Sequence, residues 1–325
     1  MKVAVLLDPE VQLDTLWNRE GNLLDWFDYY AITALRELGH DVEVIRFHYR
    51  LSETVEKLIE EAPNAIFNLM TPGRFGDMRD LAMVSTLDCM GFGYTGTGPM
   101  GLALSRDKGL SKFIVQHAGV RVPNYFVAPL EAIELPSELD FPLIVKPLSS
   151  GGGVGITADS LVFDRSSCKQ QIEFIHSSLR QPAICEQYIS GREITVGVDA
   201  TQGIEVLPPF EWLFPKDPSV PNFFTYTAKW DEEYRRRTGI YSVRPELDPD
   251  IATLVRRYSM TAFSQLRLRD YASFDFRLQE GTNDLYFIEA NANPGLWPDS
   301  GRFGLVPFHD FVERILIKAA ERCRY

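Results

Sequence analysis

The residues of this chain that could do chemistry begin with a lysine and a glycine-rich loop within residues 141–156. The apolar run 143–145 is typical of a buried strand, Lys146 follows it, and Pro147 ends the ladder. The loop then contains Gly151, Gly152, Gly153 and Gly155. Because glycine has no Cβ, the backbone N–H groups of such a loop can surround an anion. The segment therefore predicts a polyphosphate site, with a flexible linker as the alternative. It is not a Walker A loop, because the lysine precedes the glycines.

A second group of candidate residues is acidic and lies on a predicted hairpin. Residues 272–278 alternate apolar and polar side chains, and residues 281–284 have the composition of a turn. A hairpin centred on this turn places Asp275 opposite Glu289, with their Cβ atoms about 4.5–5.5 Å apart. Two carboxylates so close repel unless a cation or a proton lies between them. With the amide oxygen of Asn291, the group predicts a Mg²⁺ site, and a solvent-exposed acidic face is the alternative.

Lys108 and Glu186 are charged residues for which a ligand role and an ordinary role are both open. We expect Ser105 to cap a helix that carries Lys108 in its first turn. Its apolar face would be Leu110, Phe113 and Ile114. A lysine there opposes the helix dipole, so it is either placed for a ligand or exposed to solvent. Glu186 interrupts the apolar strand 183–189, where its partner is an adenine amino group or a structural salt bridge.

The elements that must position these residues follow from the hydrophobic pattern. Residues 23–38 have apolar residues at helical spacing, and Gly39 closes that helix. Three apolar runs predict buried strands at 2–7, 42–47 and 65–69. This alternation of strand and helix implies a small parallel α/β domain. The glycine-rich segment 91–99 marks the end of that domain.

The C-terminal half of the chain mixes regular and irregular patterns. Residues 193–198 are a further strand, and Asp248 with Pro249 begins a long helix. Between them, residues 208–247 are rich in proline, aromatic and charged residues without long periodicity. We interpret this region as a loop or lid that is mobile without nucleotide. Its basic residues are Lys229, Arg235, Arg236 and Arg237.

Composition excludes several classes of function. A chain of 325 residues suggests two or three domains, and its net charge of −12 argues against binding to nucleic acid or to anionic membranes. No apolar run approaches the length of a membrane span, and the start of the chain does not have the pattern of a signal peptide. The four cysteines and five histidines are scattered, which predicts reduced thiols in a cytoplasmic protein and no zinc site.

Taken in order, these motifs resemble those of ATP-grasp enzymes, and within that superfamily those of the D-alanine–D-alanine ligases. The resemblance covers nearly the whole chain through YTGTG, SRDK, VKP…GGGVG, EQY, GREITV, TAKW, DFRL and IEANANPG. It implies an α/β fold with ATP between two antiparallel sheets. The expected domains are an N-terminal α/β domain at 1–104, a central subdomain with the glycine loop at 105–190, and a C-terminal domain with the lid and the metal hairpin at 191–325.

The resemblance also implies roles for individual residues. The phosphate contacts are expected from Lys108, Lys146 and Gly151, with Lys229 at the γ-phosphate. The adenosine contacts are expected from Glu186, Tyr188 and Ile189 at adenine and from Glu193 at ribose. The metal ligands are Asp275, Glu289 and Asn291, for one or two Mg²⁺ ions that Mn²⁺ can replace. The catalytic set is Lys229, Arg302, Gly152 and Gly153. A homodimer is compatible with the resemblance.

Several positions depart from the pattern of the ligases. Gly152 stands where the family has a serine, and Trp230 stands where it has a tyrosine. Ser273 replaces the arginine that steadies the acyl-phosphate oxyanion, and Arg302 is the candidate substitute. The part of the pattern that binds ATP is therefore retained, whereas the part that binds the substrates is altered.

The glutamate that binds the first D-alanine in the family has no clean equivalent here, so Glu10 and Glu20 are only candidates. We therefore expect an ATP- and Mg²⁺-dependent ligase that joins a carboxylate to an amine, other than two D-alanines. A D-alanine–D-alanine ligase is the first alternative. A non-catalytic ATP-binding protein, suggested by Ser273, is the second.

Overall fold

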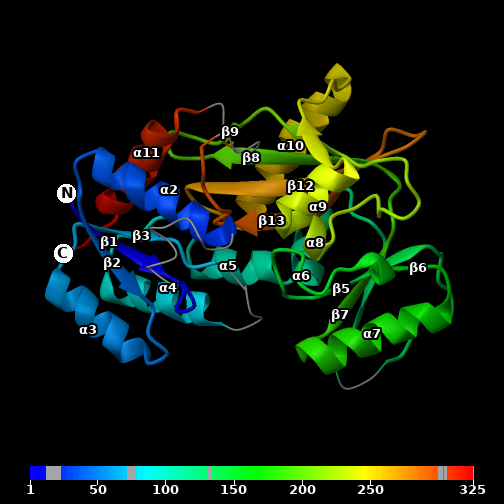
Figure 1. Ribbon diagram of the computed structural model, residues 1–325, viewed down its shortest axis with the longest axis horizontal. Helices are drawn as coiled ribbons and strands as arrows, with labels where there is room; N and C mark the ends of the chain where they lie inside the picture. Colours follow the sequence, from blue (N-terminus) through cyan, green and yellow to red (C-terminus); the bar gives the residue numbers. More distant parts are fainter. Residues whose placement is uncertain (12–22, 72–77, 131–132, 299–302, 304–305, 325) are drawn as a thin grey trace.

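The computed structural model describes the chain apart from residues 12–22, 72–77, 131–132, 299–302, 304–305 and 325. The described part of the protein contains three β-sheets, and each sheet is formed by one continuous part of the chain (Figure 1). The first has the order β2-β1-β3. Its strands are β1 Lys2–Leu7, β2 Asp41–Arg46 and β3 Ala65–Asn68, and both pairings are parallel. These are the predicted strands, and their arrangement confirms the α/β class.

Helices surround this first sheet and link it to the end of the chain. They are α2 Leu23–Glu37, α3 Leu51–Glu61, α4 Arg79–Met90 and the C-terminal α11 Phe308–Glu321. Side chains of α11 join those of β1 and β3 in one apolar cluster that includes Val5, Phe67, Ile315 and Leu316. The two termini therefore lie on the same side of the molecule (Figure 1).

The second sheet is antiparallel, has the order β4-β7-β5-β6 and carries the lysine that precedes the glycine loop. Its strands are β4 Tyr125–Ala128, β5 Leu143–Pro147, β6 Leu161–Val162 and β7 Ala183–Gln187. Helix α7, Arg165–Leu179, packs on it through Cys168, Ile172 and Ile175, which belong to the same apolar cluster as Val145. Strand β5 is buried along its length, so it holds Lys146, its penultimate residue, in a fixed position.

The third sheet is also antiparallel and has the order β11-β10-β8-β12-β13, with β9 paired to β8. Its strands are β8 Gly191–Asp199, β9 Glu205–Val206, β10 Phe210–Leu213, β11 Tyr241–Val243, β12 Tyr271–Gln279 and β13 Leu285–Ala292. Helix α10, Pro249–Gln265, covers one face and has Asp248 as its N-cap, as its sequence predicts. The three sheets fall within the three predicted domains, whose boundaries stay a prediction.

The expected lid is more regular than its sequence suggests. Strands β10 and β11 pair within the third sheet, and two short helices lie between them, α8 Tyr226–Trp230 and α9 Glu232–Thr238. The interpretation of 208–247 as an irregular loop was therefore wrong over these elements. Each is too short to have a recognisable period, and the strands are formed by pairing outside their own segments, β10 with β8 and β11 with β10.

The predicted helix around Lys108 also differs in its start and in its buried face. Two helices are present, α5 Pro99–Arg106 and α6 Lys108–His117, and Asp107 rather than Ser105 caps the second by accepting a hydrogen bond from the backbone N–H of Leu110. Leu110 and Phe113 are 42% and 52% exposed, whereas Lys108 and Lys112 are buried. The face of α6 that looks inward therefore carries charge, which hydrophobic spacing could not predict.

In the part of the chain that the structure describes, no helix is both long and apolar enough to cross a membrane.

Candidate active site

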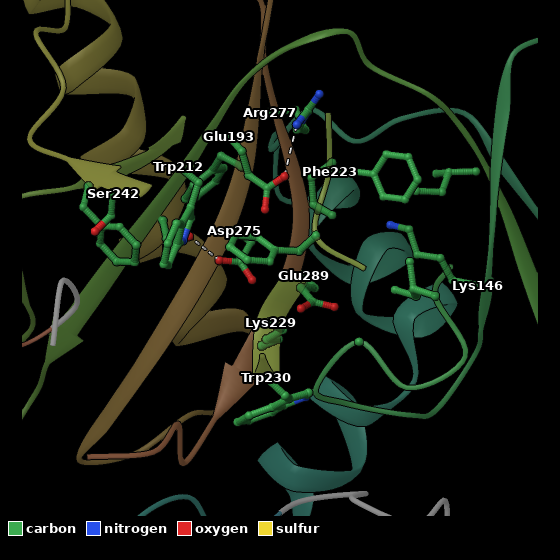
Figure 2. A pocket seen from close by; sticks show the side chains of 18 of the residues that line it. Lys146, Glu193, Trp212, Phe223, Lys229, Trp230, Ser242, Asp275, Arg277 and Glu289 are labelled. Atoms are coloured by element: carbon green, nitrogen blue, oxygen red, sulfur yellow. Dashed lines mark hydrogen bonds and ion pairs between the residues drawn. The ribbon is translucent and has the colours of Figure 1, made fainter. Parts of the chain in front are cut away.

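A cavity of about 490 Å³ lies between the second and third sheets, and the candidate residues gather around it (Figure 2). Residues of β5 and β7 line one side, and residues of β8, β12 and β13 line the other. Ten of the predicted site residues line its wall, which are Lys108, Lys146, Gly153, Glu186, Tyr188, Ile189, Glu193, Lys229, Asp275 and Glu289. A space of this size suits a nucleotide with part of a second substrate.

The acidic hairpin has the predicted register. Asp275 pairs with Glu289, and Ser273 pairs with Asn291. A β-bulge follows Asp275, so the register shifts by one residue toward the turn. One Asp275 carboxylate oxygen accepts a 2.6 Å hydrogen bond from the Thr195 hydroxyl, and the other accepts a 3.1 Å bond from the Asn291 side-chain amide. These contacts fix the orientation of the Asp275 carboxylate.

Glu289 lies in a strongly positive environment. Burial alone raises the pKa of a carboxyl group, but the ammonium groups of Lys108, Lys229 and other nearby lysines outweigh it and lower the pKa of Glu289 to about 2. The side chain is therefore ionised at neutral pH. A negative charge held permanently at this point suits the binding of a metal ion between the protein and a phosphate.

The residues present fit Mg²⁺. Asp275 and Glu289 provide carboxylate oxygens, and the Asn291 amide, whose nitrogen donates to Asp275, provides an amide oxygen. Among the described residues, no group of three or more His, Cys, Asp or Glu side chains forms a metal site. A cation here would therefore need further oxygens from water or phosphate, which is how Mg²⁺ is usually held.

Glu186 lies at the centre of a buried charge cluster. Its two carboxylate oxygens are each 3.0 Å from a lysine Nζ, one from Lys112 and the other from Lys146. The Glu186 and Lys112 side chains are 1% and 0% exposed. Burial raises the pKa of Glu186, but the two ammonium groups prevail and lower it below its ordinary value. Of the two partners considered for Glu186, the structure contains the salt bridge.

Sequence reasoning missed Lys112, although a signal was present. Lys108 and Lys112 are four residues apart, so they lie on one face of α6. Lys108 donates hydrogen bonds to the backbone carbonyls of Ser150, at 2.5 Å, and Pro147, at 3.4 Å, and so ties α6 to the glycine loop. Burial lowers the pKa of Lys108 to about 8. Two lysines at this spacing on a buried face indicate that anions lie against that face of the helix.

The glycine loop and helix α8 close on each other. Gly152 and Gly153 have φ values of +65° and +75°, a region that L side chains rarely adopt. The indole N–H of Trp230 donates a 2.7 Å hydrogen bond to the Gly152 carbonyl, and the Tyr226 backbone N–H donates to Ile156 at 2.9 Å. The structure therefore holds α8 against the loop. Gly151 and Gly152 belong to the loop but are not among the described residues that line the cavity.

Lys229 reaches the cavity from α8 on the same side as the metal hairpin (Figure 2). Among the described residues, no hydrogen bond or ion pair occupies its ammonium group, although its charge acts on Glu289. Its side chain passes close to Gly153, where an added Cβ would lie 3.8 Å from the Lys229 Cδ. A lysine without a protein partner in this position is available to a phosphate.

Glu193 lies beside Arg277 at the other end of the cavity, near Phe223 (Figure 2). The closest oxygen of Glu193 is 3.1 Å from the Arg277 guanidinium, which also donates to the backbone carbonyl of Ile189. Burial raises the pKa of Glu193 to about 7, against the effect of Arg277. Tyr188 and Ile189 complete this part of the wall.

The shifted pKa of Glu193 predicts a pH dependence. If Glu193 binds the ribose as predicted, its ionised carboxylate can accept one hydroxyl on each oxygen, whereas the protonated form keeps one good acceptor, so kcat/KM for ATP should rise as the pH increases through about 7. Glu193→Gln, whose amide oxygen accepts hydrogen bonds at every pH, should lower kcat/KM and remove this rise. Initial rates from pH 5.5 to 8.5 test this, with 2′-deoxy-ATP as a second control. The same rise in the Glu193→Gln variant would assign it to another group.

Besides Gly151, Gly152 and Asn291, which are not among the described residues that line the cavity, three candidates are not placed at the site. Arg302 and Glu20 lie outside the described residues. Glu10 is described, but it accepts a 2.9 Å hydrogen bond from Arg79 and is not among the residues that line the cavity. Ser273 is fully buried in β12, and its hydroxyl has no hydrogen-bond partner within the described chain. Because serine carries no charge, position 273 lacks the arginine cation that the resemblance predicts there for the acyl-phosphate oxyanion.

The geometry agrees with the comparisons to known proteins. A family model described as D-ala D-ala ligase C-terminus matches residues 114–304, more than half of the chain. The chain belongs to the D-alanine–D-alanine ligase family. An uncharacterized protein, y4sG, of Sinorhizobium fredii is 30% identical over 272 residues, which are 82% of this chain and 77% of that protein. The D-alanine–D-alanine ligase of Gluconobacter oxydans is 29% identical over 301 residues, 92% of this chain and 91% of the relative.

Solved structures share the ATP-grasp fold of this family. The D-alanine–D-alanine ligase of Bacillus anthracis, in complex with ATP, is similar with a TM-score of 0.74 and 19% identity, over 99% of this chain and 98% of that one. A D-Ala:D-Ser ligase of Enterococcus faecalis is similar with a TM-score of 0.69 and 16% identity, over 98% and 99%. The expected fold is confirmed, and family membership makes this protein an ATP-dependent carboxylate–amine ligase, for which ATP and Mg²⁺ are the general requirement.

Proposed function

We propose that this ligase activates a carboxylate with ATP and then joins it to an amine. A carboxylate oxygen of the first substrate attacks the γ-phosphorus, the bond to the β-γ bridging oxygen breaks, and ADP leaves. The amine nitrogen then attacks the carbonyl carbon of the acyl phosphate, inorganic phosphate leaves, and the nitrogen loses a proton. The observation that carries this proposal is the position of Lys229 and Glu289 together at one end of the cavity, with Glu193 toward the other end and Asp275 between them.

In this proposal, charged residues at different positions along the cavity bind different parts of ATP. Glu193 with Tyr188 and Ile189 holds the adenosine end, and Lys108 and Lys146 neutralise phosphate oxygens. Lys229 has no protein partner among the described residues, so it stabilises the charge of the transferred phosphoryl group. Gly153 and the rest of the loop bring backbone N–H groups close to the phosphates. Trp230, bound to the Gly152 carbonyl, keeps α8 closed and helps to exclude water.

The metal site is assigned to Asp275, Glu289 and Asn291. These three residues would hold Mg²⁺, which would supply positive charge to neutralise the phosphate oxygens. The oxygen-only donor set also accepts Mn²⁺, and phosphate oxygens could bring in a second ion. Glu289, with its low pKa, retains its charge across the range of pH in which the enzyme would work.

Two substrate specificities have support. The names of the relatives favour two D-alanines. The site favours a different pair, because Gly152 and Trp230 replace the hydroxyls expected from the resemblance, and Ser273 replaces an arginine. We propose that the substrates are a pair other than two D-alanines. Arg302 is the candidate cation for the acyl-phosphate oxyanion, and Arg235, which lines the cavity, is the alternative.

An assay of ADP release separates these specificities. With Mg-ATP and millimolar D-alanine alone, the purified enzyme should release ADP at close to its background rate. Another carboxylate and amine should raise ADP release at least about tenfold and yield an equal amount of condensed product by mass spectrometry. Robust formation of D-alanyl-D-alanine would establish the first specificity instead. ATP binding without any coupled product would favour the non-catalytic alternative. The homodimer and the cytoplasmic location stay predictions.

A further inference from the structure

Three aromatic side chains from distant parts of the chain meet at the cavity. Phe27 belongs to α2, Trp230 ends α8, and Trp297 follows β13. The rings of Phe27 and Trp297 are stacked, with centroids 4.2 Å apart and planes at 13°. Trp230 lies 6.4 Å from Phe27 at 47°. These residues, which we call the aromatic wall, all contribute to the cavity surface.

The aromatic wall lies at the end of the cavity where the phosphoryl group would be transferred. Trp230 is adjacent in sequence to Lys229, and both lie beside Glu289, away from Glu193 and Phe223 (Figure 2). If Glu193 and its neighbours hold the adenosine, the wall faces the part of the cavity that is left for the other substrates. It is therefore placed to contact the group that receives the phosphate or the amine that follows.

The wall offers apolar ring surface rather than a hydroxyl. The N–H of Trp230 is already used by the Gly152 carbonyl, 2.7 Å away. Gly152 presents no side chain, and a Cβ at this position would lie 3.3 Å from an indole carbon of Trp230. Such a Cβ would also be strained, because Gly152 has a φ of +65°. The large Trp230 ring can therefore lie against position 152 because glycine has no side chain there.

Phe27 is also held closely by a glycine. A Cβ added to Gly295 would lie 2.4 Å from the Phe27 ring, so only glycine permits this approach. Gly295 is the last residue of the Asn-Ala-Asn-Pro-Gly turn that follows the metal hairpin. The turn therefore fixes Phe27, and with it the stacked Trp297, relative to Glu289. The rings have a defined position with respect to the reacting groups.

From this arrangement we infer that one of the two substrates is an amino acid, or a related carboxylate or amine, with a flat aromatic side chain that lies against the aromatic wall. The inference rests on the proposed ligase function and names its substrate class. Aromatic groups pack favourably in offset-stacked or edge-to-face geometry, and the parallel pair Phe27–Trp297 with the tilted Trp230 offers both. A methyl group, the side chain of alanine, is too small to cover these rings.

A substrate panel with the full-length protein and Mg-ATP tests the inference. D-alanine, D-phenylalanine, D-tryptophan and their L-enantiomers are supplied singly and in pairs, and ADP and condensed product are quantified. At least one aromatic amino acid should be used with kcat/KM about 10- to 200-fold above that of D-alanine, the range typical of apolar pockets. A higher kcat/KM for D-alanine than for every aromatic amino acid would overturn the inference and leave the ligase function standing. Without any product in the whole panel, both would fail.

Variants of the wall separate recognition from packing. Trp230→Ala should reduce the preference for the aromatic substrate over D-alanine at least about tenfold. Trp230→Phe retains a flat ring and should keep most of that preference. Phe113→Ala, which truncates a ring 52% exposed on α6, should leave the ratio unchanged. An unaltered ratio in a folded Trp230→Ala enzyme would show that the wall serves only to hold α2 and α8 together, and would overturn the inference.

Discussion

Replacing Glu289 by glutamine is expected to lower kcat by about 10²–10³-fold, with the fold retained. The substitution keeps the shape of the side chain and removes the one charge that faces Asp275 across the hairpin. It leaves Lys108 and Lys229 without the carboxylate that they hold ionised, and it removes a ligand from the proposed Mg²⁺ site. The apparent affinity for Mg²⁺ should fall together with kcat.

The measurement is ADP release over a series of Mg²⁺ concentrations, with circular dichroism to verify the fold. Glu280→Gln is a matched control, because it removes the same charge from the exposed turn of the same hairpin and should leave kcat unchanged. If Glu289→Gln retains the activity and the Mg²⁺ dependence of the native enzyme, the hairpin has only a structural role.

The hairpin was predictable because local signals agree. Alternation along 272–278, turn residues at 281–284 and a second alternating run fix which residues face each other. The bulge after Asp275 was not predictable, because it depends on how β12 fits between β8 and β13. The glycine loop was also recognisable from local sequence. Its backbone has positive φ values, which favour glycine, so the loop is visible in the sequence as a run of glycines.

Helix α6 illustrates the limit of this reasoning. Periodicity assigns the apolar side to the interior, but in α6 the interior side holds Lys108 and Lys112 while Phe113 faces solvent. Their carboxylate partners, Glu186 on β7 and Glu289 on β13, are far away in sequence. No local pattern reports such partners. Phe27 and Trp297 of the aromatic wall were missed likewise, because they meet Trp230 only in the folded chain.

The buried charge cluster at the wall of the cavity predicts the second large effect, which is on stability. Glu186→Gln should lower the free energy of unfolding at pH 7 by about 3–5 kcal/mol. Glu186 is the anion that Lys112 and Lys146 share, each at 3.0 Å, and all three side chains are buried. Without it, two ammonium groups remain out of water with no carboxylate in contact. Denaturant unfolding followed by circular dichroism measures the change.

Glu173→Gln provides the matched control, because Glu173 pairs with Lys169 at 3.9 Å on the exposed face of α7 and should contribute little. The pH gives a further check. The folded pKa of Glu186 lies below its ordinary value of 4.5, so its stabilising contribution is complete above pH 4.5 and is lost as the pH falls through the folded pKa. The difference between the native protein and Glu186→Gln should therefore shrink on acidification. Equal unfolding midpoints for the two proteins at pH 7 would mean that the lysines find other partners, and that Glu186 is free to serve the nucleotide instead.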